Sequence, residues 1–475
     1  MVRLEVFILL TYSFEDKGKD SLYEYLYKQI KNDILAYKLS PGEKLPSKRA
    51  FAKHLNISTI TVENAYIQLL AEGYIYSVPK SGYYVSDISS TKALEEKRPA
   101  KRVAKSSTED EIFADFTSNS TAKDSFPFTI WTKTLRQIMS DYERELMVRS
   151  PYCGIELLRV AISDYLYQFR GMSVEPDQII IGAGTEYLYG MLIQLLGRDK
   201  RYGVEDPGYQ KITRIYQANQ VDCCHIPMDE GGVNIKALEE SASDILHISP
   251  SHHFPTGIVT PVSRRYELLS WAAKSGDRYI IEDDYDSEFR LVGKPIPSLQ
   301  SIDVADKVIY MNTFSKSLSS TIRISYMVLP KSLVALYKEH LGFYSCTVPN
   351  FEQYTLYRFI EQGHLEKHIN RMRNYYRVQR DKVLECIKNQ QNYHRVEILE
   401  ENSGLHFLMK VDTELSDDEL VSKAMENGVA ISCLSQYSYL EENATKHTII
   451  VNYSGIKTEI IPEAVDRLFE SLWNE

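Results

Sequence analysis

The spacing of apolar residues near the start of the chain predicts two helices. A first helix is expected over 21–37, where an apolar stripe repeats every four residues: Leu22, Leu26, Ile30 and Ile34. Pro41-Gly42 ends this helical unit. A second, shorter helix is expected from Lys48 to Leu55, after Ser47.

The pattern continues with a third helix and a pair of strands. Ser58 is an N-cap for a helix that runs to Glu72, with Gly73 at its C-terminal end. Strands are expected over 74–78 and 83–85, joined by a turn at 79–82. Three helices and a hairpin predict a winged helix-turn-helix, a fold that places its recognition helix in the major groove of DNA. This domain is expected over residues 1–88.

The pattern changes twice more along the chain. Residues 89–112 are rich in Ser, Lys and Glu and predict a flexible linker with a basic stretch. From 113 to 475, apolar strands alternate with amphipathic helices, most clearly at 178–181, 279–283 and 308–311. Such alternation predicts an α/β domain with a mostly parallel sheet flanked by helices. The last part, roughly 345–475, is richer in helix and predicts a small C-terminal subdomain.

Charge and cysteine content limit the kinds of ligand and site that the protein is expected to have. The formal net charge is −10, but the first 88 residues carry 11 basic and 10 acidic side chains, against 44 and 55 in the remainder. The near-neutral head can therefore still bind DNA. Six scattered cysteines without zinc spacing predict reduced thiols and no metal site. Reduced thiols are typical of a cytoplasmic protein, which is expected here. The apolar run 6–10 is too short to span a membrane.

Reactive side chains follow two of the predicted strands. Lys316 lies just after the strand 308–311, between small hydroxyl residues, where a desolvated amine can attack an aldehyde. Asp283 ends the strand 279–283, and a carboxylate there can pair with a pyridinium nitrogen. Tyr285 can donate a hydrogen bond to an oxygen on the same ring.

Two further features of the sequence predict a binding site for a phosphate group. Gly182-Ala183-Gly184-Thr185 joins the strand 178–181 to a helix from about Glu186, and a glycine-rich loop that opens a helix is an anion site. Arg323 can hold a phosphate through two parallel hydrogen bonds. Each motif alone is compatible with an ordinary turn or cap. Together, at the strand ends where α/β sheets bind ligands, they predict a cofactor pocket.

The predicted winged helix-turn-helix carries polar side chains suited to DNA. On the third helix, Glu63 and four hydroxyl or amide residues face outward near the N-terminus: Ser58, Thr59, Thr61 and Asn64. Lys48 and Arg49 begin the second helix and can neutralise phosphates, and Lys80 lies at the hairpin tip. For Glu63 a solvated helix face is an equal alternative.

Two segments resemble known families. Residues 22–86 are similar to the GntR family, through 41–49, Ser58 with Thr61-Val62, 70–75, Gly82 and Val85. Thr59 stands where that family commonly has Arg. The remainder resembles fold-type I aminotransferases, for example at 205–209 and 250–258. The whole chain therefore resembles the MocR/GabR regulators, which fuse a GntR head to this fold.

The resemblance implies pyridoxal 5'-phosphate (PLP) as cofactor and assigns roles to named residues. Lys316 would form the Schiff base, Asp283 would face the pyridine nitrogen, Tyr285 the ring hydroxyl, and Tyr209 would stack on the ring. Five residues would surround the phosphate: Gly184, Thr185, Thr313, Ser315 and Arg323. The family also implies a domain-swapped homodimer that binds double-stranded operator DNA. It favours a structural role for His252 and His253 over a catalytic one.

Departures from the family pattern bear on the signal. Phe254 replaces the Asn of working aminotransferases, and Gly455 corresponds to their carboxylate-binding Arg. Lys211 replaces a second Arg of the GabR-like amino-acid sensors. These changes favour a regulator that senses PLP itself, as in the PdxR branch that controls vitamin B6 synthesis. The alternatives are a GabR-like sensor of an amino acid or amine through an external aldimine, and a working aminotransferase with an accessory DNA-binding head.

Overall fold

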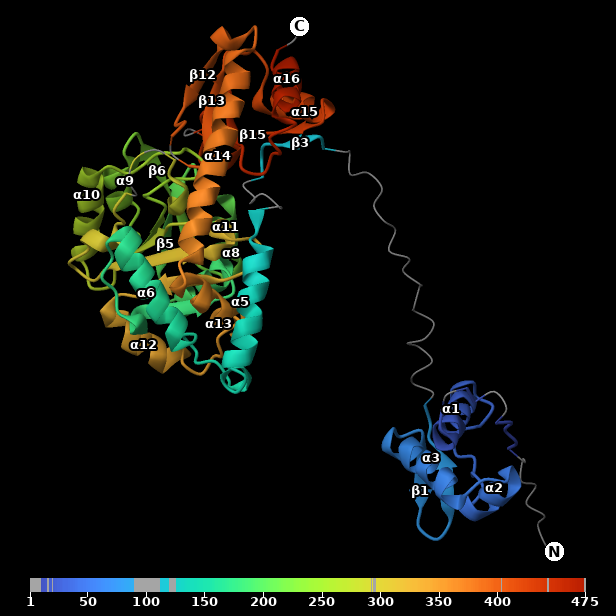
Figure 1. Cartoon of the computed structure of the whole chain (residues 1–475). Helices are drawn as coiled ribbons and strands as arrows, with labels where there is room; N and C mark the ends of the chain where they lie inside the picture. Colours follow the sequence, from blue (N-terminus) through green and yellow to red (C-terminus); the bar gives the residue numbers. More distant parts are fainter. Residues whose placement is uncertain are drawn as a thin grey trace, which may run out of the picture. The chain divides into compact units, whose positions relative to one another are not determined.

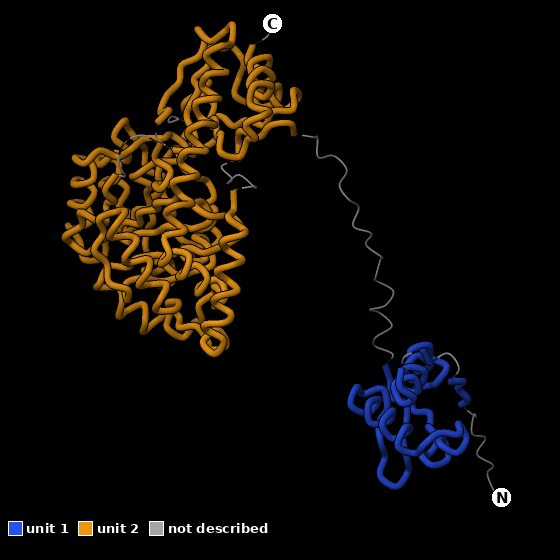
Figure 2. The backbone as a smooth tube through the Cα atoms, viewed as in Figure 1, with its two compact units in different colours: residues 1–108 blue, residues 109–475 orange. Residues whose placement is uncertain are grey.

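The protein is described from a computed structural model and divides into two compact units, residues 1–108 and 109–475 (Figure 2). The described residues are 10–14, 17–18, 20–88, 112–118, 125–291, 293, 296–402, 404–441 and 444–473. The expected linker lies outside them except for Ile112, and the N-terminal apolar run except for Leu10.

Three helices and a hairpin form the smaller unit around one apolar cluster (Figure 1). Its elements are α1 (Leu22–Leu35), α2 (Lys48–Leu55), α3 (Thr59–Ala71), β1 (Ile75–Val78) and β2 (Gly82–Val85). The Ser47 and Ser58 side chains accept hydrogen bonds from the first turns of α2 and α3, as the sequence predicts. The expected helices and strands are confirmed, although α1 ends at Leu35 and Tyr37 adopts a left-handed φ of 56°.

An eight-stranded sheet forms the centre of the larger unit, in the order β4-β11-β10-β9-β8-β5-β6-β7. The strands are β4 (Ile179–Gly182), β5 (Arg201–Asp206), β6 (Asp222–Asp229), β7 (Gly232–Val233), β8 (Ile245–Ile248), β9 (Tyr279–Asp283), β10 (Val308–Thr313) and β11 (Ser325–Val328). The five strands from β10 to β6 pair in parallel, whereas β11 pairs antiparallel with both β10 and β4. The predicted mostly parallel sheet is therefore confirmed.

Helices cover both faces of this sheet because its strands are apolar on both sides. Along β4, Ile179 and Ile181 pack in the cluster formed with α6 (Glu156–Arg170) and α13 (Asn350–Glu361). Ile180 packs on the other face, against α7 (Thr185–Leu196). The other helices of this layer are α5 (Phe128–Asp141), α8 (Gln210–Ala218), α9 (Ile235–Glu240), α10 (Val262–Ala273), α11 (Phe314–Ser317) and α12 (Lys331–Leu341).

The C-terminal part adds a second sheet that the sequence pattern did not predict. Helix α14 (His364–Lys388) leads into it (Figure 1). The four strands, β12 (Val396–Leu399), β13 (His406–Val411), β16 (Thr448–Asn452) and β15 (Ser432–Cys433), pair antiparallel in that order. They pack with α14, α15 (Asp417–Glu426) and α16 (Ile461–Ser471). The expected helix-rich subdomain therefore contains both helices and strands. Its strands were not predicted because they are short and their residues do not alternate clearly between apolar and polar.

A short strand at the start of the larger unit joins this subdomain. β3 (Ala114–Asp115) pairs in parallel with β14 (Val429–Ala430). The backbone N–H of Phe116 donates to Ala430 O at 2.9 Å, and Asn452 Nδ2 donates to Phe116 O at 3.0 Å. The segment 114–116 is therefore held by the C-terminal sheet.

Three smaller findings bear on the sequence-based expectations. All six cysteines are free thiols. Within the described ranges, there is no group of three or more His, Cys, Asp or Glu side chains placed to hold a metal ion. None of the helices formed by the described residues combines the length and apolarity needed to cross a membrane.

Candidate cofactor site

The strand register gathers four separated segments at one edge of the large sheet. Gly182 at the end of β4 is in register with Ser325 of β11, which is in register with Thr313 at the end of β10. Asp283 at the end of β9 lies beside Met311 of β10. The loops that follow β4, β9 and β10, and the segment that precedes β11, therefore open onto the same place. They carry the residues that the sequence singled out.

Lys316 lies in the single turn α11, directly after β10. Its side chain is largely shielded from water, and this desolvation lowers the pKa of Lys316 to about 8, although the nearby Asp286 carboxylate acts in the opposite direction. About a tenth of the amine is therefore unprotonated at pH 7, far more than for an exposed lysine. An unprotonated amine is the form that attacks an aldehyde.

Asp283 is buried and held from one side. Its Oδ2 accepts a hydrogen bond from the Tyr189 hydroxyl at 2.5 Å and lies 3.7 Å from His247 Nε2. The Tyr216 hydroxyl is 2.7 Å from His247 Nδ1, which fixes the histidine ring. Asp283 Oδ1 is buried and has no hydrogen-bond partner among the described residues. One carboxylate oxygen is thus positioned, and the other is left to accept a hydrogen bond.

Tyr285 lies next to a buried histidine–carboxylate pair. Its hydroxyl is 3.3 Å from His252 Nδ1, and the same nitrogen is 2.8 Å from Asp286 Oδ2. His253 contacts Thr256 Oγ1 at 2.7 Å and lies 3.4 Å from the buried Glu205. Burial lowers the pKa of His253 to about 3 and raises that of Glu205 to about 8, so both groups are mostly neutral at pH 7. Both histidines thus have partners that hold the loop 252–257 in place.

The glycine-rich loop and Arg323 are packed directly together. A Cβ atom on Gly184, whose φ is 97°, would lie 2.2 Å from Arg323 Nη2, so only glycine lets the guanidinium approach here. Thr185 begins α7, where backbone N–H groups favour anions. Ser315 Oγ is buried and has no hydrogen-bond partner within the described part of the chain. The Thr313 hydroxyl, by contrast, already accepts from Ser315 N at 3.1 Å and Ser325 Oγ at 2.8 Å.

Glu186 adds a carboxylate that the sequence analysis did not consider. Its Oε2 is 2.6 Å from Arg323 Nη2, and its Oε1 contacts Lys211 Nζ. These hydrogen-bonded cations, Lys211 foremost, lower the pKa of Glu186, so the carboxylate is ionised at neutral pH. Both Lys211 and Arg323 are therefore engaged by one side chain.

Tyr209 precedes α8 and is 49% exposed. Its ring meets Phe254 edge-on at 5.9 Å, and both line a cavity of about 220 Å³ together with His247 and Tyr437. Tyr437 and Phe254 also pack on a small apolar cluster that includes Ile450 of β16. Gly455 lies in the exposed turn after β16. The cavity beside Tyr209 is thus lined by aromatic side chains together with polar ones, among them Glu205 and Arg214.

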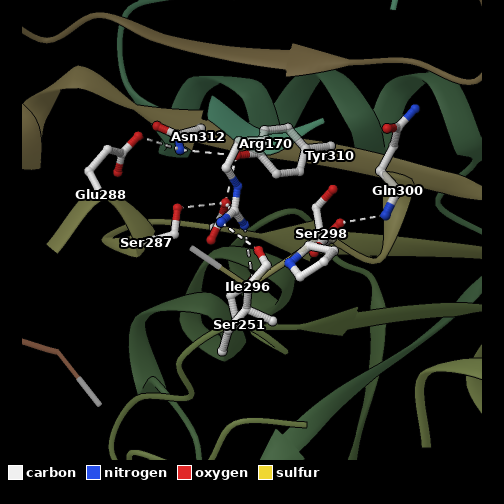
Figure 3. A network of polar contacts seen from close by, with 12 residues as sticks. Arg170, Ser251, Ser287, Glu288, Ile296, Ser298, Gln300, Tyr310 and Asn312 are labelled. Carbon is white, nitrogen blue, oxygen red and sulfur yellow. Dashed lines mark hydrogen bonds and ion pairs between the residues drawn. The ribbon is translucent and has the colours of Figure 1, made fainter. Parts of the chain in front are cut away.

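A buried polar network is centred on Asp284, the residue after Asp283 (Figure 3). Asp284 accepts from Arg170 Nη2 at 2.7 Å, the Tyr310 hydroxyl at 2.6 Å and Ser287 Oγ at 2.8 Å. Arg170 also donates to Ile296 O at 2.8 Å. Because neighbouring residues at a strand end point to opposite faces, Asp284 anchors this end of β9 while Asp283 faces the site. The sequence offered a signal for this network in the paired Asp283-Asp284.

The predicted DNA-contacting residues of the smaller unit fall into two groups, exposed side chains and side chains that contact a neighbouring residue. Arg49, Thr59, Asn64 and Lys80 are exposed, and Lys80 occupies the hairpin tip with φ 61°. Three others contact neighbours. Lys48 Nζ is 2.5 Å from Glu63 Oε1, and Ser58 Oγ is 2.8 Å from Thr61 Oγ1. Ile60, which the sequence analysis did not single out, is 68% exposed beside Thr59.

Comparison with known proteins identifies both units. Residues 22–85 match the gntR family of bacterial regulatory proteins, and residues 112–468 match the aminotransferase class I and II family. The HTH-type transcriptional regulator YdeL of Bacillus subtilis, itself uncharacterised, is 40% identical over 94% of this chain and 96% of its own length. The chain belongs to the regulators that join these two domains.

Other relatives of this regulator have more specific names. The pyridoxine biosynthesis transcriptional regulator PdxR of Corynebacterium glutamicum is 30% identical, over 88% of this chain and 89% of that protein. A probable rhizopine catabolism regulatory protein, MocR of Rhizobium meliloti, is 27% identical over 94% and 93%. The sequence-based assignment to the MocR/GabR regulators, rather than to free-standing enzymes, is thereby confirmed.

Solved structures support the fold of the larger unit. Kynurenine aminotransferase from Pyrococcus horikoshii, solved in a complex with PMP, superposes with a TM-score of 0.65 at 23% identity, covering 80% of this regulator and 97% of that chain. An archaeal alanine:glyoxylate aminotransferase gives 0.67 at 20% identity, covering 76% and 90%. The predicted aminotransferase fold is therefore confirmed.

Proposed function

We propose that this regulator binds PLP at the candidate site and that PLP itself is the signal that changes its binding to operator DNA. The observation that carries the proposal is a combination at one sheet edge. A desolvated lysine, a buried carboxylate with a free oxygen and an arginine packed on a glycine loop lie together. These are the groups that an aldehyde, a pyridine nitrogen and a phosphate need.

The residues fit the cofactor at its ring nitrogen, phosphate, ring hydroxyl, ring face and aldehyde. Asp283 Oδ1 would accept a hydrogen bond from a pyridinium N–H, with Tyr189 holding the other oxygen. Ser315 Oγ, Thr185 and Arg323 would hold the phosphate, and Tyr285 the ring hydroxyl. Tyr209 would cover the ring face. When bound, PLP supplies an aldehyde that condenses with amines and a ring that withdraws electrons. Lys316 is the amine that would attach it, and its lowered pKa favours that reaction.

Two features favour PLP over an amino acid as the effector. Lys211, which could attract a carboxylate, is already paired with Glu186. The strand before Gly455 contributes Ile450 to an apolar cluster beside Phe254. A ligand carboxylate would therefore lose at least one charge-assisted contact, worth about 1.5–3 kcal/mol. The similarity to PdxR extends the proposal to the control of vitamin B6 synthesis.

The same reasoning extends to assembly and DNA. The regulator would act as a domain-swapped homodimer, with two DNA-binding units on one operator. Arg49, Thr59, Thr61 and Asn64 would contact DNA together with Ser58, Lys48 and Lys80. Lys48 would have to exchange Glu63 for a phosphate.

The test compares three forms of the protein in one operator-binding assay: apo-protein, PLP-loaded protein, and PLP-loaded protein with a panel of amino acids and amines. We expect PLP to change DNA affinity and the panel to add little. If apo and PLP forms behave alike while one amine shifts both the absorbance spectrum and DNA binding, the alternative of an amine or amino-acid sensor is correct. Steady turnover of an amino acid with a keto acid would instead support an aminotransferase.

A further inference from the structure

Glu186 pairs with Arg323, the side chain that would hold the phosphate of PLP in the proposed function. The carboxylate lies in the first turn of α7, next to Gly184 and Thr185, and its Oε2 is 2.6 Å from Arg323 Nη2. The guanidinium is in turn pressed onto Gly184. A carboxylate on a guanidinium at a helix N-terminus is the arrangement that a phosphate would form in the same place.

The contact between Glu186 and Arg323 is supported by the surrounding structure. Arg323 adopts a left-handed φ of 49°, a conformation that costs a non-glycine residue energy and persists only where its surroundings hold it. Glu186 is held a second time, from α8, because its Oε1 contacts Lys211 Nζ. The two carboxylate oxygens are thus divided between cations on two different segments of the chain.

We propose that Glu186 is an internal competitor for the phosphate of PLP, and that Lys211, which already pairs with this carboxylate, retains it when the phosphate binds Arg323. This inference rests on the proposed function, because it assumes that PLP enters this site. A carboxylate and a phosphate cannot both pair with one guanidinium without placing like charges close together. Glu186 therefore lowers the affinity for PLP, and the occupancy of the site responds to the PLP concentration instead of staying saturated.

The proposed competition predicts that removing a charge from the binding site increases the affinity for PLP. Replacing a charged residue in a binding site ordinarily weakens binding, but Glu186→Gln should tighten PLP binding by about tenfold at low salt. Lys211→Met should act in the opposite direction and weaken it several-fold, because the displaced carboxylate would then lack a cation. All three side chains are partly exposed, so both effects should shrink as salt is added.

The experiment is a titration of the full-length apo-protein with PLP and, separately, with pyridoxal, which lacks the phosphate. Absorbance of the bound ligand gives the dissociation constants. We expect Glu186→Gln to tighten PLP and leave pyridoxal unchanged. The matched control is Glu239→Gln, which removes the same charge from an exposed ion pair, 2.6 Å long, between Glu239 of α9 and Lys274 at the end of α10. It should change neither constant.

Several results would overturn the inference. Unchanged or weaker PLP binding by Glu186→Gln would do so, as would equal tightening of PLP and pyridoxal, because the effect would then not concern the phosphate. Should Glu186→Gln fail to fold, tighter binding by Lys211→Met would also contradict it. If the unmodified chain takes up neither ligand, the proposed function itself fails. If it takes up PLP and only the variants disagree, this inference alone fails.

Discussion

In the DNA-binding unit, the residues predicted to contact DNA come from one continuous stretch, Lys48 to Lys80, and lie on the surface. In the larger unit, the candidate cofactor residues come from separate segments that are far apart in sequence, and they reach the site through buried strands. Most of the first surface can be altered one side chain at a time with little effect on folding, apart from Ser58, which caps α3. The second site is tied to the core, so a change in its supports alters stability as well as binding.

The largest expected effect tests whether the pocket depends on one amine. Lys316→Ala should abolish covalent fixation of PLP by borohydride, because Lys316 is the desolvated amine that directly follows β10 at the edge of the sheet. The measurement is cofactor absorbance that remains with the protein after reduction and dialysis. Lys331→Ala, which alters an exposed lysine paired with Glu175, is the control and should behave like the unmodified chain. Fixation that survives in Lys316→Ala would show that another amine carries the cofactor.

The next test compares the loss of stability on breaking a buried ion pair with the loss on breaking an exposed one. Arg170→Met leaves the Asp284 carboxylate buried without its cation, and breaking a buried pair in this way costs about 3–5 kcal/mol. Urea unfolding followed by tryptophan fluorescence reports this directly, because all three tryptophans lie in residues 109–475. Arg201→Met breaks an exposed pair with Asp222 on the same sheet and should cost less than about 1 kcal/mol. Equal losses in both variants would contradict the proposed importance of the buried network.

A pH series tests how strongly the pocket shields Lys316 from water. Its pKa of about 8 lies below the ordinary value for lysine, so the amine loses its proton as pH rises through 8. The initial rate of PLP fixation by the chain, corrected for Lys316→Ala, should rise about tenfold from pH 7 to 9 and then level off. An exposed lysine would give about a hundredfold rise over the same interval without levelling. A rise of that kind would mean that the site does not desolvate the amine.

The smallest effect belongs to the DNA-binding surface. Arg49→Ala should weaken binding to most sequences and reduce the slope of log K against log salt by about 0.9, as expected when one phosphate contact is lost. Because Arg49 is exposed, folding of the unit should be unaffected. Lys38→Ala, outside the predicted contact residues, serves as the control. An unchanged slope would remove Arg49 from the DNA-contacting set.

The sequence predicted what local patterns and motifs encode. The helix Lys48–Leu55 and the strand Tyr279–Asp283 have the predicted bounds, because caps and apolar runs mark them within a few residues. The C-terminal sheet was missed, since β13 and β16 pair across about forty residues and neither alternates in polarity. Glu186 was missed for a related reason. Its meaning depends on Lys211 and Arg323, which only the folded chain brings to it.

The pairing of β3 with β14 fixes where the chain is anchored as it enters the larger unit. Phe113 and Phe116 donate backbone hydrogen bonds to Gly428 and Ala430, so the segment 113–116 is bonded to the C-terminal subdomain. If the C-terminal subdomain rotated relative to the eight-stranded sheet, this attachment point of the chain would rotate with it. The first described residues of the larger unit are therefore attached to its C-terminal subdomain.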